Sequence, residues 1–245
     1  MSRPITLVNE DRLCVISDLH LGNPSFLQGR SFNSFLEYLS GRDMSLCING
    51  DGLDLLHLSF PRLMNDLPPV IERIRDFFSG KGIRIYYVVG NHDIYLESFL
   101  EGSGVFTVVP FLDVVSGGRR IHIEHGHLYD RLFLYHPGLY VQLTKMSGLC
   151  VKLFPMLFPL WEGLIHRFLQ FRKRGRKDYI DRPAFMSAAG RLFARGFDAV
   201  IFGHSHHSGL LSDGETTYAN AGSWLGREGH YIEIEMGGVR LKKWD

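Results

Sequence analysis

The stretch Val88-Val89-Gly90-Asn91-His92-Asp93 joins an apolar segment to three consecutive polar side chains. The apolar run from Ile83 to Val89 stops at Gly90, where glycine permits a sharp turn of the backbone. In an open α/β sheet, ligands bind at the carboxyl ends of the strands. We therefore expect an amide, an imidazole and a carboxylate to reach one site, although Gly-Asn is also common in ordinary turns.

The same pattern recurs at four other apolar runs. Each run leads into aspartate or histidine, which are common metal ligands. The four continuations are Asp18-Leu19-His20, Gly50-Asp51, His125-Gly126-His127 and Gly203-His204-Ser205-His206. Five strand ends of this kind are hard to obtain by chance, so the sequence predicts that they share one metal site.

Length and composition fit one globular domain in a reducing compartment. The chain has 245 residues, 45% apolar content and a net charge of +1, which gives no global signal for nucleic-acid binding. Cys14, Cys47 and Cys150 lack the spacing of a zinc site or a disulfide framework. Met1 to Glu10 lacks a secretory pattern, so we expect a cytoplasmic protein.

Hydrophobic periodicity predicts a parallel α/β unit followed by a second sheet. The unbroken apolar character of Leu13–Ser17 is typical of a central strand, and helical patterns cover 31–41 and 69–80. Strand, helix and strand in sequence imply parallel crossovers. From Thr107 onward, shorter runs separated by turns predict a second, mixed or antiparallel sheet. The later segments assigned to that sheet are 198–202, 217–220 and the pair of strands around Gly237-Gly238.

The segment 130–183 differs in composition from the rest of the chain. Residues 135–169 are rich in Leu, Phe, Tyr and Trp, and residues 167–177 carry six cations and no acid. Charged residues and prolines interrupt the apolar part, which excludes a membrane span. We interpret the segment as a helical insert or cap on a single domain of residues 1–245. It either packs on the domain or lies at an anionic membrane surface, and we favour the second interpretation.

The five motifs together resemble the signature of the calcineurin-like metallophosphoesterases. That signature is Asp-x-His, Gly-Asp, Gly-Asn-His-Asp, a histidine and Gly-His-x-His, in the order found here. The resemblance implies a four-layer α/β/β/α sandwich of two mixed sheets. It also implies two divalent metal ions, one held by Asp18, His20, Asp51 and His206 and the other by Asp51, Asn91, His125 and His204. Mixed nitrogen and oxygen ligands favour manganese, with iron and zinc as alternatives.

The expected chemistry is phosphoester hydrolysis. Two metals about 3.5–4 Å apart stabilise both the attacking and the leaving oxygen, and Asp51 is the carboxylate expected to bridge them. His92 is placed to protonate the leaving oxygen, with Asp93 orienting its imidazole. Asp54 is either an outer partner of the site or a helix cap. The expected substrate contacts are Ser17, Asn23, Arg131, Arg172, Lys173 and Arg174.

Within this superfamily the chain is most similar to the UDP-2,3-diacylglucosamine hydrolases of lipid A biosynthesis. The opening Ile16-Ser17-Asp18-Leu19-His20-Leu21, the length and the basic, apolar insert match their plan. The resemblance implies cleavage of the lipid-linked nucleotide to UMP and 2,3-diacylglucosamine 1-phosphate, at the inner face of the cytoplasmic membrane. One departure leaves the substrate open, because those enzymes typically carry Gly-Asn-Arg-Asp where this chain has Gly-Asn-His-Asp.

Three alternatives stay open. A phosphomonoesterase or phosphodiesterase with a soluble substrate would use the insert as a lid. A nuclease would bind phosphates through the cluster from Arg172 to Lys177, although we expect no stable nucleic-acid partner. A catalytically silent protein-binding scaffold would usually have lost metal ligands or the histidine of Gly-Asn-His, and this chain retains them all.

Overall fold

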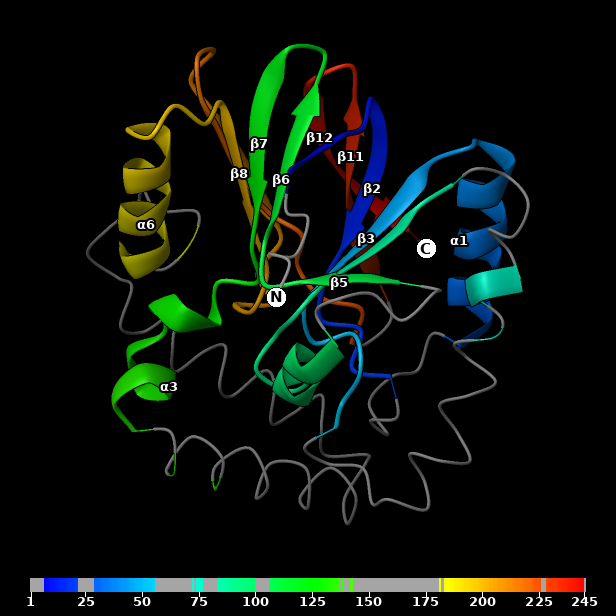
Figure 1. The fold of residues 1–245 in the computed structure, drawn as a ribbon, viewed down its shortest axis with the longest axis horizontal. Coiled ribbons are helices and arrows are strands. Elements are labelled where there is room, and N and C mark those ends of the chain that lie inside the picture. The colour runs from blue at the N-terminus through cyan, green and yellow to red at the C-terminus, as the bar shows by residue number, and fades with distance from the viewer. Residues whose placement is uncertain are drawn as a thin grey trace.

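The protein is seen here as a computed structural model, in which two six-stranded sheets pack against each other. Figure 1 shows α1 (Gly29–Gly41) and α6 (Pro183–Phe193) on opposite sides of the molecule, with the two sheets between them. This arrangement confirms the expected α/β sandwich of two mixed sheets. The described residues are 7–21, 29–55, 72, 74–76, 83–99, 106–136, 138, 142, 181, 183–225 and 228–244.

The first sheet contains the parallel unit predicted from the N-terminal half. In spatial order its strands are β12 (Gly238–Trp244), β11 (Gly229–Glu235), β2 (Arg12–Ile16), β3 (Ser45–Asn49), β4 (Ile85–Val88) and β5 (Thr107–Val109). Strands β2 to β5 run parallel, whereas β11 pairs antiparallel with β2 and β12. The carboxyl ends of β2, β3 and β4 therefore lie side by side, as predicted.

The second sheet is mixed, which confirms another prediction. In spatial order its strands are β1 (Leu7–Asn9), β6 (Leu112–Ser116), β7 (Arg119–Ile123), β8 (Ala199–Phe202), β10 (Thr217–Asn220) and β9 (Gly209–Ser212). The assignment of β5 and of the C-terminal hairpin to this sheet was wrong, because both join the first sheet. Alternation of apolar residues shows which face of a strand is buried but not which sheet edge the strand joins.

Three apolar clusters hold the layers together. Val15 and Cys47 of the first sheet meet Ile121 and Ile201 of the second between the sheets. The predicted apolar face of α1 is buried on the outer side of the first sheet, and α6 covers the second sheet in the same way. The residues buried by the two helices are Phe32, Phe35, Leu36 and Leu39 of α1 and Phe185, Ala188, Ala189 and Leu192 of α6. Each large apolar side chain buried in this way contributes about 1.5–3 kcal/mol to folding.

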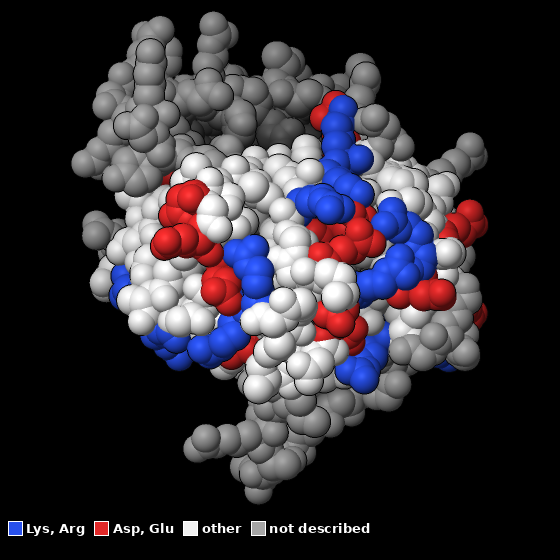
Figure 2. Space-filling model, turned by 90° about the horizontal axis from the view of Figure 1, so that it is seen from above, with Lys and Arg blue, Asp and Glu red and all other residues white. Residues whose placement is uncertain are grey.

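Charges of both signs alternate on the face opposite the strand ends. Figure 2 shows Lys and Arg interleaved with Asp and Glu on this face, in keeping with the near-zero net charge. On β11 the buried carboxylate of Glu233 lies 2.5 Å from Lys242 and 3.6 Å from Arg42. Among the residues that the structure describes, this face shows no extended basic patch.

Short helices lie at the lower end of the sheets in Figure 1. They are η1 (Ile94–Phe99), η2 (His127–Tyr129) and α3 (Arg131–Tyr135). Most of the segment 130–183 lies outside the described residues, so its interpretation as an insert stays a prediction. Among the residues that the structure describes, none of the helices has the length and apolar character needed to cross a membrane.

Candidate metal centre and active site

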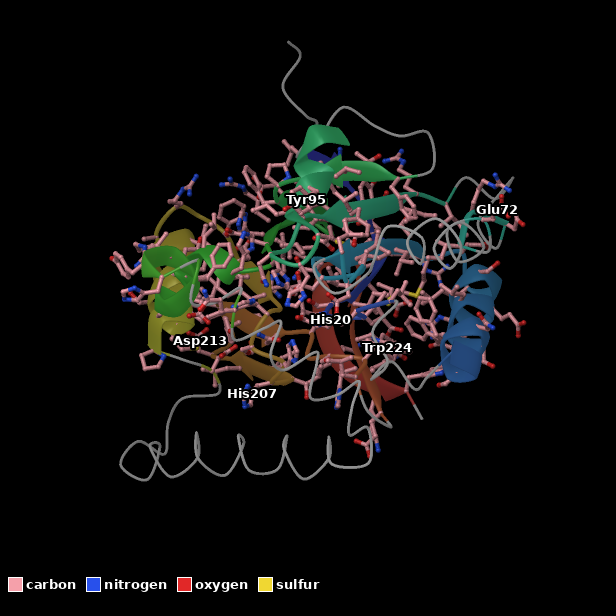
Figure 3. The ribbon with its side chains drawn as sticks, turned by 90° about the horizontal axis from the view of Figure 1, so that it is seen from below. His20, Glu72, Tyr95, His207, Asp213 and Trp224 are labelled. Atoms are coloured by element: carbon pink, nitrogen blue, oxygen red, sulfur yellow. The ribbon has the colours of Figure 1, made fainter. Side chains whose placement is uncertain are left out.

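The five predicted strand ends meet at one end of the molecule. The loop after β2 is joined to the loop after β3 by hydrogen bonds from Asp18 N to the Gly50 carbonyl (3.1 Å) and from His20 N to the Asp51 carbonyl (2.9 Å). In the second sheet, Gly203 N donates to the carbonyl of His125 (3.2 Å). Seen from below, His20 lies between Tyr95 and His207 (Figure 3). His204 N, after β8 of the second sheet, donates to Asp18 Oδ2, after β2 of the first (2.9 Å), so residues from both sheets form one candidate site.

Backbone strain is concentrated in the same loops. Left-handed φ angles at non-glycine residues cost about 1–3 kcal/mol each and persist where the surroundings enforce them. In the described part of the chain only Asp43 and Met236 adopt such angles outside this site. The five within it are Asp18 (53°), His20 (48°), Asp51 (51°), His204 (62°) and His206 (58°). The strained backbone positions in this site therefore belong to residues predicted to bind metal.

Asp18, His20 and His206 form the first cluster of candidate ligands. Their ligand atoms lie within 4.8 Å of one another. His206 Nε2 is 3.1 Å and His20 Nε2 is 3.8 Å from Asp18 Oδ1. Asp18 Oδ1 and both ring nitrogens of His20 are buried and make no hydrogen bond. Buried polar atoms are rarely left without a partner, so this cluster fits a cation.

Asp51, His125 and His204 form the second cluster. His125 Nε2 lies 3.3 Å from Asp51 Oδ2 and 3.2 Å from Asn91 Oδ1, which adds the amide oxygen to the set. The other ring nitrogen, His125 Nδ1, lies 2.8 Å from the carbonyl of Asn49. Donation from Nδ1 to this carbonyl fixes the tautomer whose Nε2 lone pair can bind a metal.

Asp51 connects the clusters. A third group of candidate ligands contains Asp51 with His20 and His92, and Asp51 Oδ2 is 4.0 Å from the Nε2 atom of each. The other carboxylate oxygen, Oδ1, accepts a hydrogen bond from the backbone N of His92 (2.8 Å). The position of this carboxylate agrees with the bridging role predicted for it, and that role stays a prediction.

The electrostatics favour the metal-binding protonation states of Asp51, His20 and His204. Burial would raise the pKa of Asp51, but the charges of His125 and His92 hold it well below the ordinary value. Burial and the charge of His92 lower the pKa of His20 to about 4. Burial also lowers the pKa of His204. An ionised carboxylate and neutral imidazoles are the forms that coordinate metals. At His125, by contrast, burial would lower the pKa, but the charges of Asp51 and Asp18 outweigh it and raise the pKa to about 10, so a metal would have to displace a proton there.

The partner of His92 differs from the prediction. His92 Nδ1 lies 3.0 Å from Oδ1 of Asp54, a residue with no exposed surface. Burial would lower the pKa of His92, but the charge of Asp51 and the hydrogen bond with Asp54 outweigh it and raise the pKa to about 9. Of the two roles considered for Asp54, the structure supports that of an outer partner of the site.

The prediction that Asp93 orients His92 was wrong. Asp93 Oδ1 accepts a hydrogen bond from Gly90 N (2.6 Å), and Oδ2 accepts from Tyr87 Oη (2.5 Å) and Gly52 N (3.0 Å). These bonds engage both oxygens of the carboxylate, while the Nδ1 atom of His92 lies against Asp54 instead. Asp93 therefore shapes the turns that carry the neighbouring side chains.

Other predicted contacts have mixed outcomes. Ser17 is fully buried, with Oγ 2.5 Å from Asp18 Oδ2 and 2.7 Å from the Asn49 carbonyl, so it supports Asp18 and its prediction as a phosphate contact was wrong. Arg131 begins α3, but its side chain lies outside the described part. Asn23, Arg172, Lys173 and Arg174 also lie outside the described residues.

Sequence reasoning also missed three residues that hold the loop after β8. Asp130 contacts His204, while Asp181 and Asn220 form hydrogen bonds around Ser205. No motif marks a lone aspartate or asparagine, so only their contacts reveal them.

One comparison with known proteins identifies a family. The family model described as calcineurin-like phosphoesterase matches residues 12–208. The search of curated proteins found no match. Similar solved structures include a predicted phosphoesterase from Streptococcus pneumoniae (16% identity over 96% of this chain and 88% of that one, TM-score 0.42). Another is an archaeal phosphodiesterase, with 13% identity over 95% of this chain and 98% of that one and a TM-score of 0.47. A third is Vacuolar Protein Sorting 29 from Cryptosporidium parvum, with 13% identity over 96% of each chain and a TM-score of 0.47.

Proposed function

The chain belongs to the calcineurin-like phosphoesterase family and is a metal-dependent phosphoesterase, and we propose that it uses two metal ions together with a protonated His92. The observation that carries this proposal is the pair formed by His92 and Asp54 (3.0 Å) beside the shared carboxylate of Asp51. This position, next to the candidate metal ligands, supports a role for His92 as proton donor.

The residues present suit two divalent ions, for which we propose manganese. Asp18, His20 and His206 would hold one ion, while Asn91, His125 and His204 would hold the other, and Asp51 would be shared. The orphaned atoms of Asp18 and His20 support this assignment, as does the mixture of nitrogen and oxygen donors. Such a pair of ions neutralises phosphate charge and makes water a nucleophile at neutral pH.

His92 is proposed to donate a proton to the leaving oxygen. With a pKa of about 9, its imidazole carries a proton on each nitrogen at neutral pH. The Nδ1 proton is bound by Asp54, so the Nε2 proton is the one available on the side of Asp51. A cation at Asp51 would weaken the attraction from that carboxylate, so the hydrogen bond with Asp54 would be the contact that still favours the charged form of His92.

Two classes of substrate follow from different observations. The sequence likeness and the basic insert favour UDP-2,3-diacylglucosamine, cleaved at its diphosphate on an anionic membrane surface. The protonated His92 favours a phosphate monoester or diester of an alcohol, because an alkoxide needs a proton on leaving more than a phosphate does. We propose the lipid-linked diphosphate as the first candidate and an alkyl phosphoester as the second.

A substrate panel tests both candidates. Purified protein would be assayed with nitrophenyl esters, cyclic nucleotides, alkyl phosphates and UDP-2,3-diacylglucosamine, each with Mn²⁺ and after chelation. We expect activity that chelation abolishes and Mn²⁺ restores. Release of UMP in detergent micelles would support the lipid substrate, whereas turnover of alkyl phosphates alone would support the second candidate. Activity that survives chelation on every substrate would contradict the two-metal proposal.

A further inference from the structure

Aspartates near the two ends of the segment 130–183 hold the loop Gly203–His206. This loop follows β8 and supplies one candidate ligand to each cluster, since His206 lies with Asp18 and His204 lies with Asp51. Asp130 contacts the loop from one end of the segment and Asp181 contacts it from the other. A small displacement of this loop would therefore move candidate ligands of both metals.

Asp130 fixes the orientation of His204. Its Oδ2 atom lies 3.2 Å from His204 Nε2. The backbone of Asp130 is held in turn, because its N donates to the His127 carbonyl (3.1 Å) and its carbonyl accepts from Leu134 N (2.9 Å). A hydrogen bond from His204 Nε2 selects the tautomer with a lone pair on Nδ1. That tautomer can bind a metal through Nδ1 while a carboxylate holds the other nitrogen.

Asp181 holds the middle of the loop. Its buried Oδ2 atom accepts hydrogen bonds from Ser205 Oγ (3.0 Å), Tyr218 Oη (2.6 Å) and Asn220 Nδ2 (2.8 Å). Asn220 also donates to the carbonyl of Gly203 (2.9 Å), which ties the first residue of the loop to the same network. Hydrogen bonds to an ionised carboxylate are stronger than bonds between neutral groups.

The backbone of this loop requires such support. Ser205 stands between His204 (φ 62°) and His206 (φ 58°), two residues in the left-handed region that L side chains rarely adopt. Ser205 N also donates to the Gly203 carbonyl across a tight turn (2.7 Å). Strained conformations persist only where neighbouring groups over-determine them, and the hydroxyl of Ser205 is bound at the centre of the strained pair.

We propose that Asp130 and Asp181 are positioning residues for the metal-binding loop. Asp130 sets the ring nitrogen that His204 presents to the second metal, and Asp181 fixes the backbone that sends His204 and His206 to different metals. This inference rests on the two-metal function proposed above. A merely structural role would affect folding stability without changing metal affinity, which separates the two roles experimentally.

The test measures metal binding by the purified full-length chain. Asp130→Asn, Asp181→Asn and Ser205→Ala would be compared with wild type by metal analysis after dialysis and by titration with Co²⁺ followed by absorption spectroscopy. The matched control is Asp113→Asn, because Asp113 holds His122 at 2.6 Å in the same kind of carboxylate–histidine pair, and neither residue belongs to a candidate metal group. Circular dichroism would verify the fold of each variant.

We expect both wild type and Asp113→Asn to bind two Co²⁺ ions, and the affinity for each ion should be the same in the two proteins. Asp130→Asn should keep one ion and bind the second about 10–100-fold more weakly, as is usual when the outer partner of a metal ligand is lost. Asp181→Asn should weaken the binding of both ions. Ser205→Ala should do so to a smaller extent, because it removes one of the three hydrogen bonds that described residues donate to Asp181. If Asp181→Asn does not fold, the affinity of Ser205→Ala decides the role of Asp181.

If each loop variant binds two Co²⁺ ions with the affinity of wild type, the inference is overturned. An equal loss in Asp113→Asn would also overturn it, because the effect would then be general. Wild type that binds no Co²⁺ would instead contradict the proposed two-metal function, so the two failures can be told apart.

Discussion

His92 and Asp54 are joined by a hydrogen bond between Nδ1 and Oδ1 (3.0 Å) across 38 residues of sequence. The two residues follow neighbouring parallel strands, β4 and β3, so the sheet itself places the proposed proton donor beside its partner. The pair resembles the imidazole–carboxylate arrangement by which many enzymes hold a histidine in its charged form.

Replacement of His92 or Asp54 should slow hydrolysis most for substrates with poor leaving groups. We expect His92→Asn to slow hydrolysis of an alkyl phosphate about 10²–10⁴-fold and that of nitrophenyl phosphate much less. Asp54→Asn should show the same preference with a smaller loss, because the imidazole remains. The measurement is kcat/KM for both substrates, with Asp213→Asn in an exposed turn as the control. Equal losses on the two substrates would argue against proton donation.

Asp51→Asn should abolish activity and sharply lower metal content while the fold is retained. The carboxylate belongs to two of the three groups of candidate ligands, and an amide cannot bridge two cations in its place. Metal analysis together with circular dichroism checks this expectation. Near-normal turnover in the variant would show that the metals do not share this residue.

His122 should stabilise the fold in a pH-dependent way. Its ring nitrogens lie 2.6 Å from Asp113 Oδ1 and 3.3 Å from Glu124 Oε2. Burial would lower the pKa of His122, but these hydrogen bonds outweigh it and raise the pKa above the ordinary value. A raised pKa in the folded state means that the stabilisation is complete below the unfolded pKa of about 6.5 and is lost as the pH rises through the folded value.

We therefore expect His122→Gln to lower the urea midpoint more at acidic pH than at alkaline pH. Asp113→Asn should remove part of the same pH dependence, because it takes away one of the two carboxylate partners. His122 also packs beside Phe111 and Phe197, with ring centroids 5.4 and 5.1 Å away. A loss of stability that is the same at every pH would assign the effect to this packing alone.

The basic cluster in 167–177 should bind anionic membranes. Each cation near such a surface contributes about 1 kcal/mol, and salt screens the interaction. We expect the protein to sediment with anionic but not neutral liposomes, and added salt should release it. The variant in which five of the six cations are neutralised should lose binding and activity on a bilayer substrate yet keep activity on a soluble ester. Its five positions are Arg172, Lys173, Arg174, Arg176 and Lys177. Normal turnover of the lipid substrate by this variant would leave the segment as a lid or a packed helix.

The sequence predicted the strand ends well because each one combines two local signals, an apolar run and a polar continuation. The apolar face of α1 was predictable for a similar reason, since helical spacing alone selects Phe32, Phe35, Leu36 and Leu39. Sheet membership of β5 and β11 depends on pairing between distant segments, for which no local signal exists.

The partner of His92 was mistaken for a related reason. Asp93 is adjacent in sequence, but its carboxylate accepts hydrogen bonds from Gly90 N and Tyr87 Oη. Asp54, Asp130 and Asp181 reach the site from other loops, so only the folded chain brings them there.

The candidate ligands come from both sheets, and this origin gives the metals a mechanical role besides the chemical one. His206 meets Asp18 at 3.1 Å and His125 meets Asp51 at 3.3 Å, and each pair joins a loop of one sheet to a loop of the other. A cation bound between such partners would link the two sheets. At a free metal concentration of 100 times Kd, each ion would add about 2.7 kcal/mol to the stability of the folded state. The two sheets would then separate only after the metals are released, so the cooperativity of unfolding would depend on bound metal as well as on the apolar core.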